Sequence, residues 1–273
     1  MISLYEDETI EDLQLDGLRM IQQRDGFRFG EDSVLLAHFV LDALKRTPKA
    51  KRFIVDLGCN CGSIDLILSA KLPGCRITGI EIAPKAAGIF KRNIKLNRLE
   101  DRMGCICKDW KHIKEDFRQG EADCIISNPP YAVFNDKSDK EVTDLRIARE
   151  EIYSSLDQLL QISSYLLKPC GRAFYIYRAN RLADVLEGMR MYSIEPRTIR
   201  FVQPFLHRAP TAFLVMGQKD GKAGGLKVEA PLVLFDSPSK YTEEVLIMYG
   251  KYPPLSQEEL FRGIEMITGE SAE

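Results

Sequence analysis

The segment Asn128-Pro129-Pro130-Tyr131 combines the groups that could hold a planar amine. The carboxamide of Asn128 and the carbonyl of Pro129 can accept hydrogen bonds from an NH2 group, and Tyr131 offers a flat ring for stacking. Two consecutive prolines stop the apolar run before them, so Asn128 is predicted to stand on a stiff mount at the carboxyl end of a buried strand. Open α/β sheets bind ligands at that end. The alternative is a rigid turn whose tyrosine packs into the core.

A glycine-containing turn, Val55 to Gly62, closes the first core strand and opens a helix. Gly58 and Gly62 permit a tight turn and let a ligand lie against bare backbone, while the helix amino terminus favours a carboxylate or phosphate. The dinucleotide fingerprint G-x-G-x-x-G is not matched, because Asn60 takes its second glycine position and position 63 is not glycine. The pattern therefore disfavours a nicotinamide cofactor.

Two acidic residues, Glu81 and Asp109, follow the next two predicted strands. A carboxylate at Glu81 can accept both hydroxyls of a ribose, as an acid at this place does in nucleoside-binding α/β folds. Asp109 can receive an adenine amino group, and the indole of Trp110 can flank the ring. Either acid alone is more often a solvated turn residue. Together with Asp56 and the glycine turn, acids after three successive strands predict a nucleoside site.

The elements that must position these residues alternate between short apolar strands and amphipathic helices from residue 53 onward. This alternation predicts an α/β fold with a Rossmann-like, seven-stranded, mostly parallel, doubly wound sheet. The predicted strands are Phe53 to Asp56, Arg76 to Glu81, Met103 to Cys107, Ala122 to Ser127, Ala173 to Tyr177, Thr198 to Val202 and Ala212 to Met216. The predicted helices are Ser63 to Lys71, Pro84 to Asn97, Asp144 to Leu167 (stopped by Pro169) and Arg181 to Met191.

Composition divides the chain into an extension (1–50), a core (51–218) and a tail packed on the core (219–273), to which we assign no chemistry. We expect residues 1–17 to be loosely docked. A hairpin is predicted around Asp25-Gly26, between strands at 18–22 and 27–29, before a helix that begins near Asp32 or Ser33.

Global composition excludes several classes of protein. The 273 residues carry a formal net charge of −2, so RNA or another polyanion must meet a local basic surface. The seven cysteines lack CxxC spacing, and we expect reduced, packed thiols and no structural metal. Neither a charged-then-apolar leader nor an apolar run of membrane-spanning length occurs, so we expect a cytoplasmic protein without a membrane partner.

These motifs resemble the class I S-adenosylmethionine-dependent methyltransferases. The resemblance implies that Asp56, Gly58 and Gly62 cradle the methionine part of the donor, that Glu81 holds the ribose and that Asp109 meets the adenine. Asn-Pro-Pro-Tyr is similar to the signature of members that methylate a nitrogen of a base or of a glutamine side chain. The donor-binding residues are then Asp56, Gly58, Asn60, Gly62, Glu81, Asp109, Trp110 and Asn128, and the catalytic residues are Asn128, Pro129, Pro130 and Tyr131.

Further segments resemble the bacterial tRNA1(Val) adenine-N6 methyltransferases over nearly the whole chain. They are Asp25 to Gly30, Asp32 to Ala37, Ala148 to Glu151, Pro231 to Asp236 and Tyr241 to Val245. The resemblance implies a tRNA substrate and methylation of the unpaired adenine beside the anticodon. Where the family often has Ala-Arg-His-Glu, this chain has Ala-Arg-Glu-Glu, so no role of that histidine passes to Glu150.

The chemistry requires geometry more than a strong base. The methyl group of a sulfonium is already electrophilic, so acceptors at Asn128 and Pro129 need only aim the amine and stabilise its growing charge. A paired base cannot reach such a pocket, so the adenine must be flipped or already unpaired, with Tyr131 stacked on it and Phe134 closing the other side. Candidate RNA contacts are Lys137, Lys140, Arg146, Arg149, Arg178, Arg181, Arg197, Arg200 and Arg208.

Two alternatives stay open at this point. The runner-up enzyme methylates a glutamine amide of a protein such as a release factor, because Asn-Pro-Pro-Tyr serves both substrates. A catalytically idle RNA-binding protein with the same fold is the third hypothesis.

Overall fold

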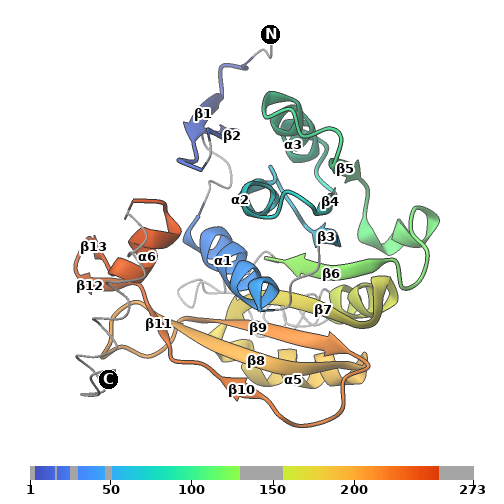
Figure 1. Ribbon diagram of the computed structural model, residues 1–273, viewed down its shortest axis with the longest axis vertical. Coiled ribbons are helices and arrows are strands. Elements are labelled where there is room, and N and C mark those ends of the chain that lie inside the picture. The colour runs from blue at the N-terminus through green and yellow to red at the C-terminus, as the bar shows by residue number, and fades with distance from the viewer. Residues whose placement is uncertain (1–3, 16, 25–29, 47–50, 130–155, 252–273) are drawn as a thin grey trace, which may run out of the picture.

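The computed structural model describes residues 4–15, 17–24, 30–46, 51–129 and 156–251. A nine-stranded sheet in the order β10-β8-β9-β7-β6-β3-β4-β5, with β11 also paired to β8, runs through these residues (Figure 1). Strands β3 to β7 are mutually parallel, and β9 is antiparallel to its neighbours β7 and β8. The seven longer strands are β3 (Phe53–Leu57), β4 (Arg76–Glu81), β5 (Met103–Cys107), β6 (Ala122–Ser127), β7 (Leu167–Arg178), β8 (Ile194–Gln203) and β9 (Ala212–Lys219).

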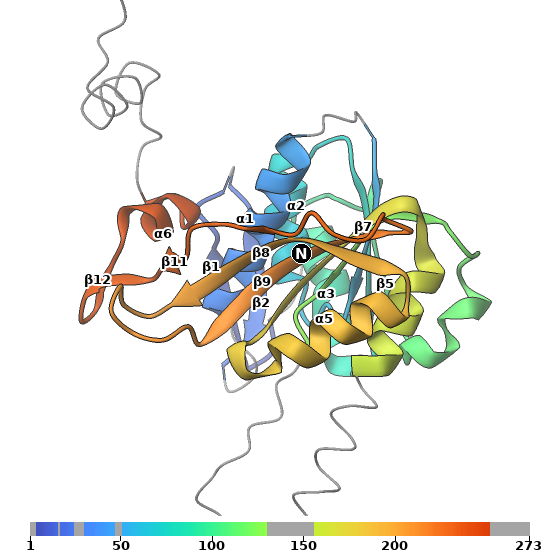
Figure 2. The same ribbon diagram turned by 90° about the horizontal axis from the view of Figure 1, so that it is seen from below.

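Helices cover both faces of this sheet, because its strands are apolar on both sides. Along β7, Phe174 and Ile176 pack into one core cluster, and Tyr175 and Tyr177 into the other. Figure 2 shows α1 and α2 on one side of the strands and α5 on the other. The first face is covered by α1 (Glu31–Lys45), α2 (Ser63–Lys71) and α3 (Pro84–Leu96), and the second by the helical residues 156–166, α5 (Leu182–Met191) and the short η1 (Trp110–Glu115).

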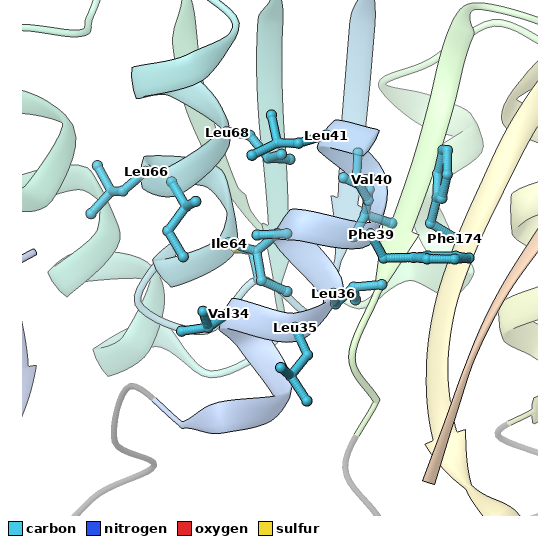
Figure 3. Packing of buried hydrophobic residues seen from close by; sticks show 14 of the residues in the cluster. Val34, Leu35, Leu36, Phe39, Val40, Leu41, Ile64, Leu66, Leu68 and Phe174 are labelled. Carbon is cyan, nitrogen blue, oxygen red and sulfur yellow. The ribbon is translucent and has the colours of Figure 1, made fainter. Parts of the chain in front are cut away.

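Helix α1 packs against α2 and β7 through a nearly continuous apolar surface (Figure 3). Val34, Leu36 and Val40 are at most 1% exposed. The ring of Phe39 meets that of Phe174 edge to face, with centroids 6.2 Å apart. This packing places the amino end of α1 beside the carboxyl end of β7.

The amino-terminal segment is docked more firmly than its composition predicts. Strand β2 (Arg19–Gln23) pairs with the preceding β1 (Glu8–Asp12), so the expectation of a loose start is wrong, and the predicted partner strand at 27–29 lies outside the described residues. Residues 25–29, with the predicted Asp-Gly turn, lie outside the described residues. Polar contacts explain the docking: the buried Asn93 of α3 accepts from the Ile21 N–H at 2.7 Å, and Arg92 makes a two-pronged ion pair with Glu8.

The predicted helix Asp144 to Leu167 ends within one residue of its expected end, but Pro169 is not what stops it. Residues 156–166 are helical, the earlier part of that prediction lies outside the described residues, and β7 begins at Leu167. Pro169 therefore stands inside a strand and does not stop a helix. The register with β6 shifts between Ala122 and Cys124, and this irregularity accommodates the proline because it interrupts the ladder.

The carboxyl-terminal segment extends the sheet and then folds beside it. Strands β10 (Lys227–Val228) and β11 (Leu232–Val233) both pair with β8. They lead to β12 (Phe235–Ser237), β13 (Lys240–Tyr241) and α6 (Glu243–Met248), which we call the C-terminal unit. No helix in the described part of the chain is long and apolar enough to cross a membrane.

Two buried carboxyl groups, Asp56 on β3 and Asp65 on α2, lie against each other, each 1% exposed. Their four oxygens find no N–H or O–H donor from any other described residue, so a hydrogen bond between them requires a shared proton. Burial, with the nearby Asp65, Glu81 and Cys105, holds the pKa of Asp56 well above its usual range. Burial also raises the pKa of Asp65 to about 7.

This pair predicts that stability falls as pH rises. An unfolded aspartate has a pKa of about 3.9, and a raised folded-state pKa means that the folded protein holds the proton more tightly. The stabilisation is complete at low pH and is lost as pH rises from about 4 through about 7. Asp65→Asn should remove the part of this loss that comes from Asp65 and raise the unfolding temperature at high pH by about 3–6 °C, measured by calorimetry across the pH range. The exposed Asp101→Asn is the control, and an unaltered pH profile in Asp65→Asn would contradict the shared proton.

Candidate active site

The predicted functional residues gather at one edge of the sheet, where the parallel strands end. Because β8 is antiparallel to β9 and β9 to β7, β8 ends at this edge too. The edge therefore carries, in spatial order, the segments that follow β5, β4, β3, β6, β7 and β8. The first three contain the residues predicted to bind the donor, and the fourth contains Asn128.

The glycine turn after β3 adopts the backbone that its residues predict. Gly58, Asn60 and Gly62 all have positive φ, at 83°, 50° and 82°. A Cβ at Gly62, which caps α2, would overlap the ring of Phe90, so only glycine fits there. The Gly62 N–H donates to the Cys59 carbonyl at 2.9 Å, which closes the turn and leaves a bare backbone surface at the start of α2.

Glu81 fixes this turn to the end of β4. One carboxylate oxygen accepts the Asn60 N–H at 2.9 Å, and the other accepts the Ala83 N–H at 2.8 Å. The side chain is largely buried at 9% exposure. Because each carboxylate oxygen has a second lone pair, Glu81 can still accept a ligand hydroxyl while it holds the turn.

Asp109 and Trp110 lie on the far side of the same turn. Asp109 caps the short helix η1 by accepting the Lys111 N–H at 3.0 Å, and its side chain is 29% exposed. The indole of Trp110 stands beside Gly58, where an added Cβ would be 3.7 Å from its Cζ3 atom. Glu81, the glycine turn and Trp110 therefore surround one region of the edge.

Asn128 stands next to this region across β6 and β3. The buried Ser127 hydroxyl donates to the Leu57 carbonyl at 2.6 Å and locks the two strand ends together. Asn128 is half-buried at the end of β6, and Pro129 is buried. Pro130 and Tyr131, together with Phe134, Lys137, Lys140, Arg146, Arg149 and Glu150, lie outside the described residues.

Asp56 is placed differently from a residue that touches a ligand. It lies beneath the glycine turn, 1% exposed, against Asp65. The thiols of Cys59 and Cys61 in the turn above it are also buried. Burial raises the pKa of Cys59 well above its usual range and the pKa of Cys61 to about 11. Asp56 therefore supports the turn from below and does not present a carboxylate to the edge.

Two features of the edge escaped the sequence analysis. Ile82, directly after Glu81, is 63% exposed although it is a large apolar residue, and a purine ring could cover it. Asp32, at the amino end of α1, lies within the electrostatic reach of Arg178 at the end of β7, and burial raises the pKa of Asp32. The sequence does carry a signal for Ile82: a large apolar residue directly after Glu81, the acid that ends a predicted strand, is placed to meet the same ligand.

The predicted RNA contacts within the described residues do not form one face. Arg181 bonds Asp184 at 2.6 Å, Arg197 donates to the Gly224 carbonyl, and Arg200 pairs with Glu244. Arg178 and Arg208 are exposed, at the end of β7 and in the loop after β8. Among the residues that the structure describes, no group of three or more His, Cys, Asp or Glu side chains could hold a metal ion.

Solved structures with the same fold are methyltransferases. A predicted O-methyltransferase from Agrobacterium tumefaciens matches with a TM-score of 0.62 at 19% identity, covering 81% of this chain and 96% of the other. A Listeria monocytogenes protein described as a class I S-adenosylmethionine-dependent methyltransferase matches with a TM-score of 0.57 at 15% identity, covering 86% and 75% of the two chains. The predicted fold class is confirmed.

Sequence relatives narrow the assignment. A family model, the methyltransferase small domain, matches residues 32–159. A release factor glutamine methyltransferase from Buchnera aphidicola is 33% identical over 113 residues, 41% of this chain and 38% of that relative. A tRNA1(Val) (adenine(37)-N6)-methyltransferase from Porphyromonas gingivalis W83 is 30% identical over 192 residues, 68% of this chain and 72% of that relative. The chain therefore belongs to the tRNA1(Val) (adenine-N6)-methyltransferase family and is an S-adenosylmethionine-dependent methyltransferase.

Proposed function

We propose that the protein methylates N6 of an unpaired adenine in tRNA, the adenine beside the anticodon of tRNA1(Val). The observation that carries this proposal is the position of Asn128 next to the glycine turn, which we also call the donor turn. The strands that carry the two are joined by the hydrogen bond from the Ser127 hydroxyl to the Leu57 carbonyl. The named activity of the Porphyromonas gingivalis relative supports the choice of substrate.

The described residues fit the donor that the family uses. The bare backbone between Gly58 and Gly62 leaves room for its methionine part, and the amino end of α2 favours its carboxylate. Glu81 can accept the ribose hydroxyls, and Ile82 with Trp110 offers apolar surface to the purine. When bound, S-adenosylmethionine supplies an electrophilic methyl group.

The protein's own part in the reaction is to hold and orient the amine. The Asn128 side-chain oxygen and the Pro129 carbonyl accept the two N–H bonds of the adenine amino group, so its lone pair points at the methyl group. The same two oxygens stabilise the positive charge that grows on nitrogen during transfer. An adenine inside a helix could not enter this edge, so an unpaired loop base is the fitting substrate.

A second candidate substrate is the glutamine amide of a release factor. The similarity to the Buchnera aphidicola glutamine methyltransferase, which covers 41% of this chain, supports this second candidate. A carboxamide presents the same planar NH2 group as adenine, so Asn128 and Pro129 would hold it in the same way.

Labelled donor separates these substrates. Transfer to unmodified tRNA1(Val) and not to a release factor, with N6-methyladenosine found by mass spectrometry of the digested RNA, is the expected result. Transfer to the release factor alone would establish the second candidate. Donor binding without transfer to either would indicate an idle RNA-binding protein.

Asn128→Ala should reduce turnover by about 10²–10³-fold, because it removes one acceptor for the amine in the transition state. The affinity for S-adenosylmethionine should stay within about threefold, because the donor is held mainly by the turn and Glu81. Steady-state kinetics and calorimetric titration measure the two quantities. Turnover near that of the wild type would remove the proposed role.

Glu81→Gln should weaken donor binding by about tenfold or more, because it loses the charge and one of the two backbone acceptors that fix the turn. Turnover at saturating donor should change much less. The exposed Glu100→Gln serves as the control for the titration. An unchanged dissociation constant in Glu81→Gln would show that the ribose assignment is wrong.

A further inference from the structure

The target strand must approach Asn128 from one side. The donor-binding turns follow β3, β4 and β5, and Asn128 follows β6. The part of this edge that the donor leaves open lies beyond β6, over the ends of β7 and β8. Within the described residues, this part includes the amino end of α1, Arg178 and the segment after it, the loop after β8 (residues 204–211) and the C-terminal unit.

The loop after β8 is held as a fixed turn. The Arg208 N–H donates to the Phe205 carbonyl at 2.9 Å, which closes a turn with Leu206 and His207 at its tip. The Gln203 side chain donates to the Arg208 carbonyl at 3.0 Å. Where the loop ends, the Thr211 carbonyl accepts the Ala179 N–H at 3.0 Å, which joins it to the segment after β7.

A row of four aromatic rings connects this loop to α1. The Phe205 ring lies 5.7 Å from that of Phe235, which stacks on Tyr241 at 4.8 Å, and Tyr249 follows at 5.6 Å. The Tyr241 hydroxyl donates to the Glu31 carboxylate at 2.6 Å. Figure 2 shows the C-terminal unit beyond the end of β8. The loop is therefore braced from behind by the C-terminal unit.

The surface of the turn suits a single-stranded polyanion. Leu206 is 65% exposed at the tip, where an apolar side chain can lie against an unpaired base. His207 and Arg208 beside it are exposed, and residues 204–211 include no acid. The exposed Arg178 lies at the end of β7, within the electrostatic reach of Asp32, so the cations that the turn itself offers are those of residues 207 and 208. The exposed acid of β12, Asp236, lies 4.0 Å from the Lys240 ammonium, which offsets its charge.

We propose that the turn Leu206-His207-Arg208 is the RNA-docking element of this enzyme and grips the strand that flanks the target adenine. Arg208 binds a phosphate, and Leu206 lies against a neighbouring base. The inference rests on the proposed function for the identity of the RNA. Recognition of that RNA is thereby assigned to a turn that lies apart from the donor-binding residues. The C-terminal unit holds this turn in place.

Binding and transfer are measured separately to test the proposal. Fluorescence anisotropy with an unmodified tRNA1(Val) transcript, with S-adenosylhomocysteine present, compares Arg208→Glu and Leu206→Ser with the wild type at several salt concentrations. The matched control is Arg118→Glu, an exposed arginine that precedes β6 at the opposite edge of the sheet. Methyl transfer to the transcript and to a release factor is measured in parallel.

Arg208→Glu should weaken RNA binding by about tenfold or more and lower the salt slope by about one, because a phosphate contact is lost. Leu206→Ser should weaken binding by about fivefold or more with an unchanged salt slope, because it removes the apolar surface that lies against a base and changes no charge. Both variants should bind S-adenosylhomocysteine within about twofold of the wild type, which separates lost docking from misfolding.

RNA affinities of both variants equal to that of Arg118→Glu would overturn the proposal, as would a wild type that does not bind the transcript. A wild type that binds RNA without methylating adenine would instead overturn the proposed function, and the variants' affinities would still judge the docking surface. Variants that impair transfer to a release factor and leave RNA binding intact would assign the turn to a protein substrate and overturn the inference.

Discussion

The active edge depends on one carboxylate, that of Glu81, and on the two N–H groups it accepts. One comes from Asn60 in the glycine turn and the other from Ala83, just before α3 begins. A turn that contains three residues with positive φ has few hydrogen bonds of its own, and the end of β4 supplies external acceptors: the Ile80 carbonyl for the N–H groups of Gly58 and Cys59, and Glu81 for that of Asn60. The residue that can meet the ligand is therefore also the residue that fixes the surface on which the ligand lies.

The turn constrains the core beneath it as well. At Gly62 a side chain would overlap Phe90, and at Gly79 of β4 an added Cβ would lie 2.5 Å from the Cys59 sulfur. The thiol of Cys59 thus occupies the space that a larger residue of β4 would fill. The four carboxyl oxygens of Asp56 and Asp65 have no partner in this close packing, and burial of this kind favours their protonated forms.

The part of the fold with regular alternation could be predicted from sequence. Strands β4, β5 and β6 and helix α2 match the predicted limits, because apolar runs and amphipathic periods are local signals. The pairing of β2 with β1 was not predicted, because β1 carries acids and little periodicity. The side chains that hold β2, Asn93 and Asn97, lie more than seventy residues away in sequence. Pro169 was misread because a strand irregularity leaves no sequence signal.

In the site, too, residues marked by a local pattern could be predicted from the sequence, and those that depend on distant contacts could not. Asn128 and the glycine turn could be predicted because they follow buried strands and break a pattern visibly. The burial of Asp56 could not be predicted. An acid at the end of a strand can point to either face of the sheet, and here the packing against Asp65 of α2 determines its direction. Nor could the roles of Arg178 and Arg208 be separated from those of Arg197 and Arg200. Arg197 donates to the carbonyl of Gly224 and Arg200 pairs with Glu244, and no local sequence pattern indicates these distant partners.

The two terminal segments then have related structural roles at opposite halves of the edge. Asn93 bonds the backbone of Ile21 and also donates to the Cys61 carbonyl at 2.9 Å, so the amino-terminal hairpin is fastened to the back of the donor turn. The C-terminal unit, through Tyr241 and Glu31, is fastened to α1 on the acceptor side. A sheet edge made of loops has little stiffness of its own, because loop backbone is the least supported part of a fold. Segments without chemistry of their own thus supply the rigidity that both halves of a methyl transfer require, and a change far from Asn128 can alter the reaction by loosening either half.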